Sequence, residues 1–253
     1  RSTSIFPYPN AVSHFAAPLV TILIAVFVSG KARLNPVQRQ VMTFALSVGA
    51  LGVLFAQTEA AIAAILVSLF VVSFNYRVGP SRTVPFAIVA ILIVMVLPAS
   101  RTVALQKFTL QDWSGQTRIA QWEETWRFLT DSPSHFLLGA GPDSYPQAIL
   151  PYHTHNYLEI FQYPHNLFLN IWVEIGLIGL VGFGFIAYEV ARVAYNHRRQ
   201  HFIAPLFAGL LTMTLHGLVD VPYFKNDLSM LTWTLIAILL IAARTERAWL
   251  AHD

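Results

Sequence analysis

Long apolar stretches separated by short polar connections dominate this chain of 253 residues. A helix needs about 20 predominantly apolar residues to cross a bilayer, and fewer where flanking residues reach the interface. The pattern predicts seven such helices, at roughly 15–30, 40–56, 60–76, 84–98, 166–195, 202–219 and 228–244. The expected fold class is therefore all-α, a polytopic transmembrane helix bundle with about seven helices.

The largest polar interruption divides the chain into N-terminal transmembrane helices (1–98), a long loop (99–164) and C-terminal transmembrane helices (165–253). Within the loop, Ser114 is expected to cap a helix with apolar residues at every third or fourth position. These apolar residues are Ile119, Trp122, Trp126 and Leu129. We expect this helix to lie at the membrane interface, with its tryptophans at the level of the headgroups.

The remaining positions of this interfacial helix are polar: Arg118, Gln121, Glu123, Glu124 and Arg127. Taken singly, Arg118 and Arg127 could equally be solvated or paired with the neighbouring glutamates, because exposed ion pairs are common and contribute little. Other evidence is needed to give either arginine a function.

Composition supports a membrane protein and excludes an ordinary soluble domain. Hydrophobic residues make up 55% of the chain and charged residues 11%, and the mean hydropathy is +0.55. The net charge of +3 suggests no nucleic-acid partner, because basic residues occupy helix ends rather than one patch. Cysteine is absent, which excludes disulfides and thiolate ligands. The chain begins at Arg1 without a signal-peptide pattern, so we expect an N-terminally truncated fragment.

Basic residues favour cytoplasmic loops and so indicate the orientation. If residues 1–14 lie outside, the cytoplasmic connections hold ten of the sixteen lysines and arginines: Lys31, Arg33, Arg39, Arg77, Arg82, Arg192, Arg198, Arg199, Arg244 and Arg247. The long loop, the turn 57–59, His165 and Asp220 then share the extracytoplasmic face. Convergence of polar groups on one face is what a site requires.

The helix expected at 166–195 combines one carboxylate with spaced glycines. Glu174 is interpreted as an interhelical hydrogen-bond anchor, because a carboxylate in an apolar helix needs a partner. One stripe of the helix, predicted to let another helix approach closely, contains Gly176, Gly179 and Gly182. In the preceding loop, Gly139 and Gly141 permit a tight turn or close approach to a ligand.

Histidines near the end of the long loop raise the question of a metal site. His153, His155 and His165 lie near Glu159, but their spacing matches no zinc motif, so no metal is predicted. A neutral histidine acting as a base or hydrogen-bond partner is favoured, since its ordinary pKa of about 6.5 suits proton transfer. Farther along, His216 and Asp220 are expected one helical turn apart, where they could pair or Asp220 could orient an arginine.

In chain order, these motifs resemble the signature loop and following helix of the O-antigen ligase family of polytopic membrane proteins. The motifs are Arg118 with Trp122, then Gly139-Ala140-Gly141-Pro142, then His165-Asn166 with Leu169, Glu174, Gly176 and Gly179. Similar segments at Tyr8-Pro9-Asn10 and His216-Gly217-Leu218-Val219-Asp220 extend the resemblance over nearly the whole chain. The family includes lipopolysaccharide O-antigen ligases, O-antigen polymerases and some protein O-oligosaccharyltransferases.

The resemblance implies glycosyl transfer at the outer face of the bacterial cytoplasmic membrane. The implied donor is a glycan on undecaprenyl diphosphate, and the acceptor is a hydroxyl on a lipid-linked sugar or a protein. By resemblance, His165 is the candidate base and Arg118 the candidate diphosphate clamp, a role in which an arginine needs no metal or other cofactor. Further candidate substrate-binding residues are Arg101, Arg127, Gly139, Gly141, Asn166 and Asp220.

One position departs from the family pattern. Members often carry a Ser-Arg pair where this chain has Thr58-Glu59, and Glu59 cannot clamp a phosphate. The alternatives are that Arg101 or Arg127 substitutes, that the donor differs, or that transferase activity is lost.

Two other classes of function compete with glycan transfer. A small-solute transporter could line its pathway with Glu174, His216 and Asp220, although the sequence shows neither the broken helices nor the repeats typical of transporters. A structural scaffold would not need a long loop rich in Arg, His and Trp. The sequence does not separate a ligase from a polymerase.

Overall fold

The computed structural model describes residues 9–29, 34–75, 106, 109–155, 157–222 and 226–250, and every regular element in them is a helix. The predicted all-α class is confirmed for these residues. The helix expected at 84–98 lies outside them, as does the candidate residue Arg101.

Six described helices correspond to six of the predicted apolar segments: α1 (Pro9–Ser29), α2 (Pro36–Ala56), α3 (Glu59–Asn75), α9 (Leu167–Asn196), α10 (Ile203–His216) and α11 (Asn226–Leu250). By length and composition α1, α2, α9 and α11 can cross a membrane, whereas α3 and α10 are shorter apolar helices. Membrane character is therefore supported, and the count of seven spanning helices stays a prediction.

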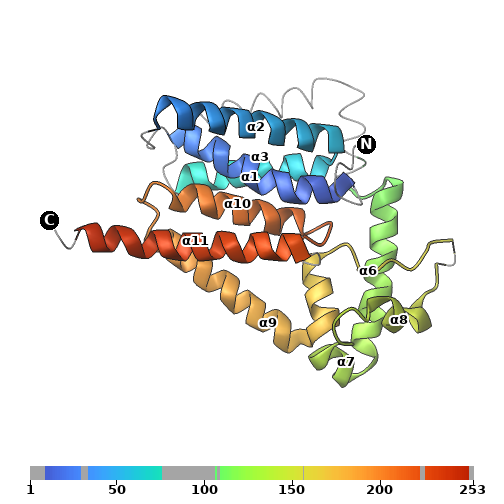
Figure 1. Ribbon diagram of the computed structural model, residues 1–253. Coiled ribbons are helices and arrows are strands. Elements are labelled where there is room, and N and C mark those ends of the chain that lie inside the picture. The colour runs from blue at the N-terminus through green and yellow to red at the C-terminus, as the bar shows by residue number, and fades with distance from the viewer. Residues whose placement is uncertain are drawn as a thin grey trace. The chain divides into compact units, whose positions relative to one another are not determined.

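The first of two compact units is built from apolar helices. It contains α1, α2, α3, the part of α9 from Tyr188, α10 and α11. Within it α10 packs against α1, α3 and α11, and α1 also packs against α2 and α3 (Figure 1). Small residues permit the close packing, since a Cβ on Gly209 would lie 2.7 Å from the Ile22 side chain. The Thr21 and Thr212 hydroxyls hydrogen-bond across the same interface at 3.0 Å.

Polar side chains meet at one end of this first unit. The Thr58 hydroxyl, just before α3, donates to Asn10 Oδ1 near the start of α1 at 3.4 Å. The His216 ring, at the end of α10, stacks on the His14 ring with centroids 3.7 Å apart. Because α10 ends at His216, Asp220 does not follow it by one helical turn. The helical geometry expected for the His216–Asp220 pair was therefore wrong.

The second unit contains the loop helices. It comprises α6 (Trp113–Asp131), α7 (Pro133–Leu138), α8 (Tyr145–Ile149), the 3-10 turn η1 (Leu150–Tyr152), α9 up to Ala187, and the segment Gly217–Val221. Its apolar core consists of Phe128, Leu129, Tyr145, Ile149 and Val173. The helix predicted in the loop is thus present as α6, packed against α7, α8 and η1.

Two details of α6 differ from the prediction. Its N-cap is Asp112, whose Oδ1 accepts a hydrogen bond from the Gly115 amide at 3.1 Å, rather than Ser114. Its buried face includes Gln121 and Glu124, whereas the Trp126 side chain is 50% exposed. Apolar spacing alone predicted the wrong buried face, because polar partners elsewhere in the unit accommodate these two residues.

A sharp bend interrupts α9 at Ile175 and Gly176, and Figure 1 shows the change of direction. Gly176 has φ 72° and ψ −179°, a conformation that strongly favours glycine. The bend frees the carbonyls of Val173 and Glu174, which accept hydrogen bonds from the amides of Ala140 at 2.6 Å and Gly141 at 3.1 Å. The loop backbone therefore replaces the helical hydrogen bonds that α9 lacks here.

Close backbone approach explains two of the glycines. A Cβ on Gly139 would overlap the Val173 carbonyl oxygen, and one on Gly176 would overlap the Leu137 carbonyl oxygen. The close approach predicted for Gly139 is confirmed, but the neighbour is α9 itself. The expected Gly176–Gly179–Gly182 packing stripe was wrong, because Gly176 lies in the bend beside α7 and no described atom lies within 4 Å of a Cβ on Gly182.

Glu174 also has different partners from those expected. Its carboxyl group hydrogen-bonds with the Asn170 side chain, one turn earlier in α9, and with the backbone of Asp143. Glu174 is thus a hydrogen-bond anchor, as predicted, but it holds the loop after Gly141 rather than another long helix.

Candidate functional site

Three consecutive backbone carbonyls organise the candidate site. Those of Gly217 and Leu218 accept hydrogen bonds from the Leu167 amide at 2.7 Å and from Asn166 Nδ2 at 3.0 Å. The next carbonyl, that of Val219, accepts one from Arg118 Nε at 2.7 Å. We call Gly217–Val219 the carbonyl row. It brings α6 and the start of α9 to one short stretch of chain.

His165 lies immediately before this anchored start of α9. Its φ of 48° is in the left-handed region, which is uncommon for a residue other than glycine. Contacts on both sides hold this conformation. Trp122 Nε1 donates to the Pro164 carbonyl at 2.8 Å. Asn166 Oδ1 caps α9 by accepting hydrogen bonds from the amides of Phe168 and Leu169, at 3.0 and 3.1 Å.

The surroundings of the His165 imidazole indicate its tautomer. Nδ1 lies 3.3 Å from the Tyr163 carbonyl oxygen, which can only accept a hydrogen bond. The contact therefore requires the proton on Nδ1, and the neutral ring then carries its lone pair on Nε2. The Phe161 and Tyr163 rings flank the imidazole, with centroids 5.2 and 4.9 Å away. The arrangement suits a base that takes up a proton at Nε2.

Arg118 is held by the residues on either side of its guanidinium. Besides the bond from Nε to the carbonyl row, Nη1 donates to the Ser114 hydroxyl at 2.8 Å and to the Ser114 carbonyl at 3.3 Å. These bonds fix the plane of a group that stays charged at any physiological pH. A fixed guanidinium of this kind can bind the oxygens of a phosphate group.

Asp220 follows the carbonyl row directly. It is buried, and its Oδ1 accepts a hydrogen bond from the Val221 amide at 2.8 Å. The structure thus brings together four of the residues named from the sequence around 217–220: Arg118, His165, Asn166 and Asp220.

The other candidates lie elsewhere in the same unit. Arg127 is nine residues beyond Arg118, about 13 Å along α6 and on its opposite side. Its Nη1 donates to the Thr154 hydroxyl at 3.3 Å. Gly139 and Gly141 lie at the bend of α9.

A buried carboxylate that the sequence did not single out organises the end of the long loop. Glu124 is 4% exposed, and its Oε1 accepts hydrogen bonds from the amides of Thr154 and His155, at 2.9 and 3.2 Å. His155 Nδ1 lies 2.8 Å from the same oxygen, and His153 Nδ1 lies 3.1 Å from Oε2. We call Glu124 with residues 153–155 the Glu124 clasp.

The ionisation of Glu124 follows from these contacts. Burial by itself raises the pKa of Glu124, but the hydrogen bonds from His155, Thr154 and His153 outweigh it, so that the pKa is below its usual value. The carboxylate is therefore charged at neutral pH. A sequence signal did exist, because Ala120, Glu124 and Phe128 follow one another at intervals of four on the buried face of α6.

The histidines considered for a metal have other roles in this arrangement. His153 and His155 turn their Nδ1 atoms toward the Glu124 carboxylate, and the His165 ring lies between aromatic side chains. Among the residues that the structure describes, no group of three His, Asp or Glu side chains is arranged to hold a metal ion.

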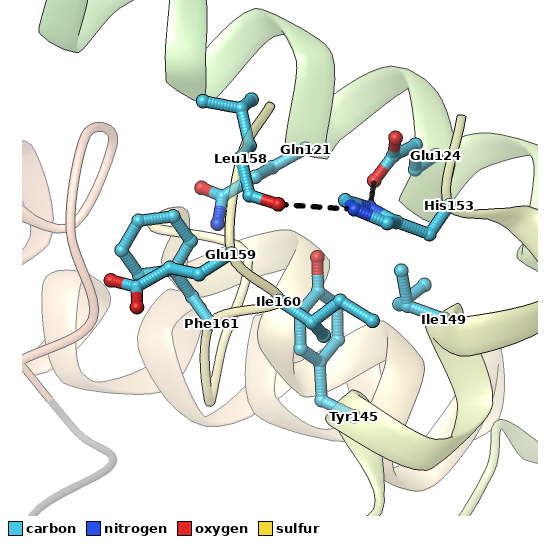
Figure 2. Close-up of a pocket in the computed structure, with 9 residues that line it drawn as sticks. All are labelled: Gln121, Glu124, Tyr145, Ile149, His153, Leu158, Glu159, Ile160 and Phe161. Atoms are coloured by element: carbon cyan, nitrogen blue, oxygen red, sulfur yellow. Dashed lines mark hydrogen bonds and ion pairs between the residues drawn. The ribbon is translucent and has the colours of Figure 1, made fainter. Parts of the chain in front are cut away.

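A small recess lies beside the clasp, between α6, α8 and the segment 158–161 (Figure 2). Its lining residues are Gln121, Glu124, Tyr145, Ile149, His153, Leu158, Glu159, Ile160 and Phe161. Burial raises the pKa of Tyr145, whose hydroxyl lies 3.0 Å from the Thr125 hydroxyl. Tyr145 is therefore a neutral part of the wall.

Comparison with known proteins gives one family. The model of a family described as O-antigen ligase matches residues 42–184, more than half of the chain. The match includes Arg118, the glycines of the loop and His165-Asn166. No curated protein matches the chain.

Proposed function

The chain belongs to the O-antigen ligase family, a membrane family of ligase- and polymerase-type glycan transfer, and on that premise we propose the reaction and its residues. The proposed donor is a glycan on undecaprenyl diphosphate, and the acceptor is a hydroxyl on a lipid-linked sugar or a protein. The proposed location is the extracytoplasmic face of the bacterial inner membrane, with the protein spanning it several times.

The carbonyl row is the observation that carries this proposal. Arg118 and Asn166 donate to the adjacent carbonyls of Val219 and Leu218, so a fixed cation and the residue after His165 share one anchor. A diphosphate leaving group and an acceptor hydroxyl must meet within one such site.

The proposed reaction assigns one role to each group. His165 Nε2 takes the proton of the acceptor hydroxyl while the hydroxyl oxygen attacks the anomeric carbon of the donor sugar. The bond between that carbon and the diphosphate oxygen breaks, and undecaprenyl diphosphate leaves. The Arg118 guanidinium stabilises the negative charge that develops on the leaving oxygens.

The remaining candidates have supporting roles in the proposal. Asp220 and Asn166 keep the site in shape, and Gly139 and Gly141 hold the loop close to α9. Arg127, and also Arg101 outside the described residues, are candidates for a second contact with the donor. Glu59 lies in the first turn of α3, where an acidic side chain favours the helix N-terminus. This explains its presence without a phosphate to bind.

The bend of α9 bears on the transporter alternative. Broken helices in transporters expose backbone groups that bind solutes or ions. Here the freed carbonyls of Val173 and Glu174 accept hydrogen bonds from the Ala140 and Gly141 amides. The bend therefore anchors a loop, which favours a fixed extracytoplasmic site over a solute pathway.

The test is transfer by the complete purified protein in lipid vesicles, from an undecaprenyl diphosphate-linked glycan to lipid and protein acceptors. Wild type should transfer the glycan, and His165→Ala should lose at least about a hundredfold of the rate, as expected for a general base. The matched control is His201→Ala at an exposed turn. Full activity of His165→Ala would remove His165 from the mechanism.

Two further arms extend this test. Activity should survive EDTA if no metal takes part, and loss on chelation would return attention to the loop histidines. Absence of transfer to every acceptor, together with solute uptake into the vesicles, would replace the proposal by the transporter alternative.

A further inference from the structure

Gln121 is a buried side chain without a role in the reaction above. It is 5% exposed, and neither its Oε1 nor its Nε2 has a hydrogen-bond partner among the described residues. Leaving a buried amide unsatisfied costs about 1–3 kcal/mol for each group. Such a group in a folded protein calls for an explanation, and one explanation is an absent ligand.

The Gln121 amide lies at the recess beside the Glu124 clasp. Figure 2 shows the amide turned toward the segment 158–161, with the Phe161 ring and Glu159 on the same side. The other polar groups deeper in the wall are engaged, since His153 bonds with Glu124 and with the Leu158 carbonyl. The Gln121 amide is thus the buried polar group that a ligand in this recess can still satisfy.

The size of the recess limits the ligand to a substituent. Its space is about 220 Å³ including the open mouth, compared with roughly 300–1,000 Å³ for pockets that enclose a whole drug-sized molecule. A single chemical group therefore fits better than a complete sugar ring.

The chemistry of the wall selects the group. A glutamine amide offers one acceptor oxygen and an NH₂ donor at the spacing of another amide. Ile149, Leu158 and Ile160 add apolar surface suited to a methyl group. The Glu124 and Glu159 carboxylates disfavour a phosphate, and a lone hydroxyl would satisfy less of the Gln121 amide and leave the apolar wall uncovered.

We propose that this recess binds the N-acetyl group of a 2-acetamido sugar in the glycan substrate. The acetamido N–H donates to Gln121 Oε1, its carbonyl accepts from Nε2, and its methyl group contacts the apolar wall. This inference rests on the proposed function. Gln121 lies three residues after Arg118 in α6, about 4.5 Å along the axis, which sets the recess beside the proposed diphosphate clamp.

Two donors that differ only at C2 provide the test: polyprenyl diphosphate N-acetylglucosamine and polyprenyl diphosphate glucose. Wild type should prefer the acetamido donor by about tenfold in kcat/KM, as two net hydrogen bonds imply. Gln121→Leu keeps the size but removes both hydrogen-bonding groups, and should bring the ratio close to one. Gln116→Leu, at an exposed amide of the same helix, should keep the wild-type ratio.

Binding without turnover distinguishes this inference from the proposed reaction. N-acetylglucosamine 1-phosphate and glucose 1-phosphate are compared by saturation-transfer NMR on the full chain. A preference for the acetamido compound that disappears in Gln121→Leu supports the recess even if neither donor is transferred. Equal binding of both compounds by wild type, or a preference that persists in Gln121→Leu, would overturn it and leave the recess as a site for water.

Discussion

The two compact units are stabilised in different ways. In the first, α10 packs against its neighbours through apolar side chains such as Ile203 and Leu210, and the Thr21–Thr212 contact accompanies bonds to each helix's own backbone. In the second, side chains reach backbone atoms far along the chain. Arg118 donates to a carbonyl 101 residues away, and Trp122 to one 42 residues away.

This difference predicts how each unit responds to substitution. Apolar packing spreads its stabilisation over many weak contacts, so one change removes little. A long-range polar contact depends on one side chain, and its loss leaves a buried partner unsatisfied at about 1–3 kcal/mol. The second unit, which holds the candidate site, should therefore show the larger effects of single conservative substitutions.

Gly176→Ala should have the largest effect on stability. The new Cβ would overlap the Leu137 carbonyl oxygen at a φ that glycine favours, so we expect a loss of at least about 3 kcal/mol. Thermal unfolding in detergent measures it. Gly182→Ala is the matched control, because its Cβ meets no described atom within 4 Å, and it should be neutral. Equal loss in both variants would contradict the role assigned to the bend.

Arg118→Lys comes next and concerns activity. Lysine keeps the charge but cannot donate to the Val219 carbonyl, to Ser114 and to a phosphate in one plane. We expect about a hundredfold loss of kcat/KM, or about 2.7 kcal/mol. Arg199→Lys, at an exposed position, should behave like wild type. Full activity of Arg118→Lys would give Arg118 a surface role.

Glu124→Gln should loosen the end of the loop and cost about 2 kcal/mol at neutral pH, because a neutral amide replaces a buried carboxylate with several donors around it. Glu123→Gln, at the exposed neighbouring residue, should cost little. Limited proteolysis across residues 153–158 and thermal unfolding measure the difference. Thr212→Val in the first unit should cost less than Glu124→Gln, and a larger cost would break the comparison between the units.

The same variant gives a pH dependence. Because the folded pKa of Glu124 is lowered, its stabilisation is fully present above the unfolded value near 4.5 and is lost as pH falls through the folded pKa. The stability difference between wild type and Glu124→Gln should therefore be constant from neutral pH to about 5 and shrink below 4. A difference that grows on acidification would contradict an ionised Glu124 in the clasp.

Ser114→Ala should have the smallest effect. It removes the 2.8 Å hydrogen bond from Arg118 Nη1 but leaves the bond to the carbonyl row, so we expect about a fivefold increase in the donor KM with little change in kcat. Ser114→Thr should restore most of the affinity. Thr117→Ala, which removes a hydroxyl bonded only within α6, is the control. An unchanged KM in Ser114→Ala would show that Arg118 is positioned by the carbonyl row alone.

The sequence predicted those parts of the molecule that depend on local pattern. The apolar helices followed from length and periodicity, and the motifs around Arg118 and His165 lie where the candidate site forms. The roles of Glu124 and Gln121 were not predicted, because their burial depends on segments 30 or more residues away. The bend at Gly176 was missed for the same reason, since it requires the loop amides of Ala140 and Gly141.

The bond between that loop and α9 has a consequence for hydrogen exchange. Loop amides normally exchange quickly with D₂O, because small local openings expose them. The Ala140 and Gly141 amides, however, are bonded to α9 carbonyls in place of helical amides. They can exchange only when the bent helix itself opens, so these two loop positions should show protection as high as the helix to which they are bonded.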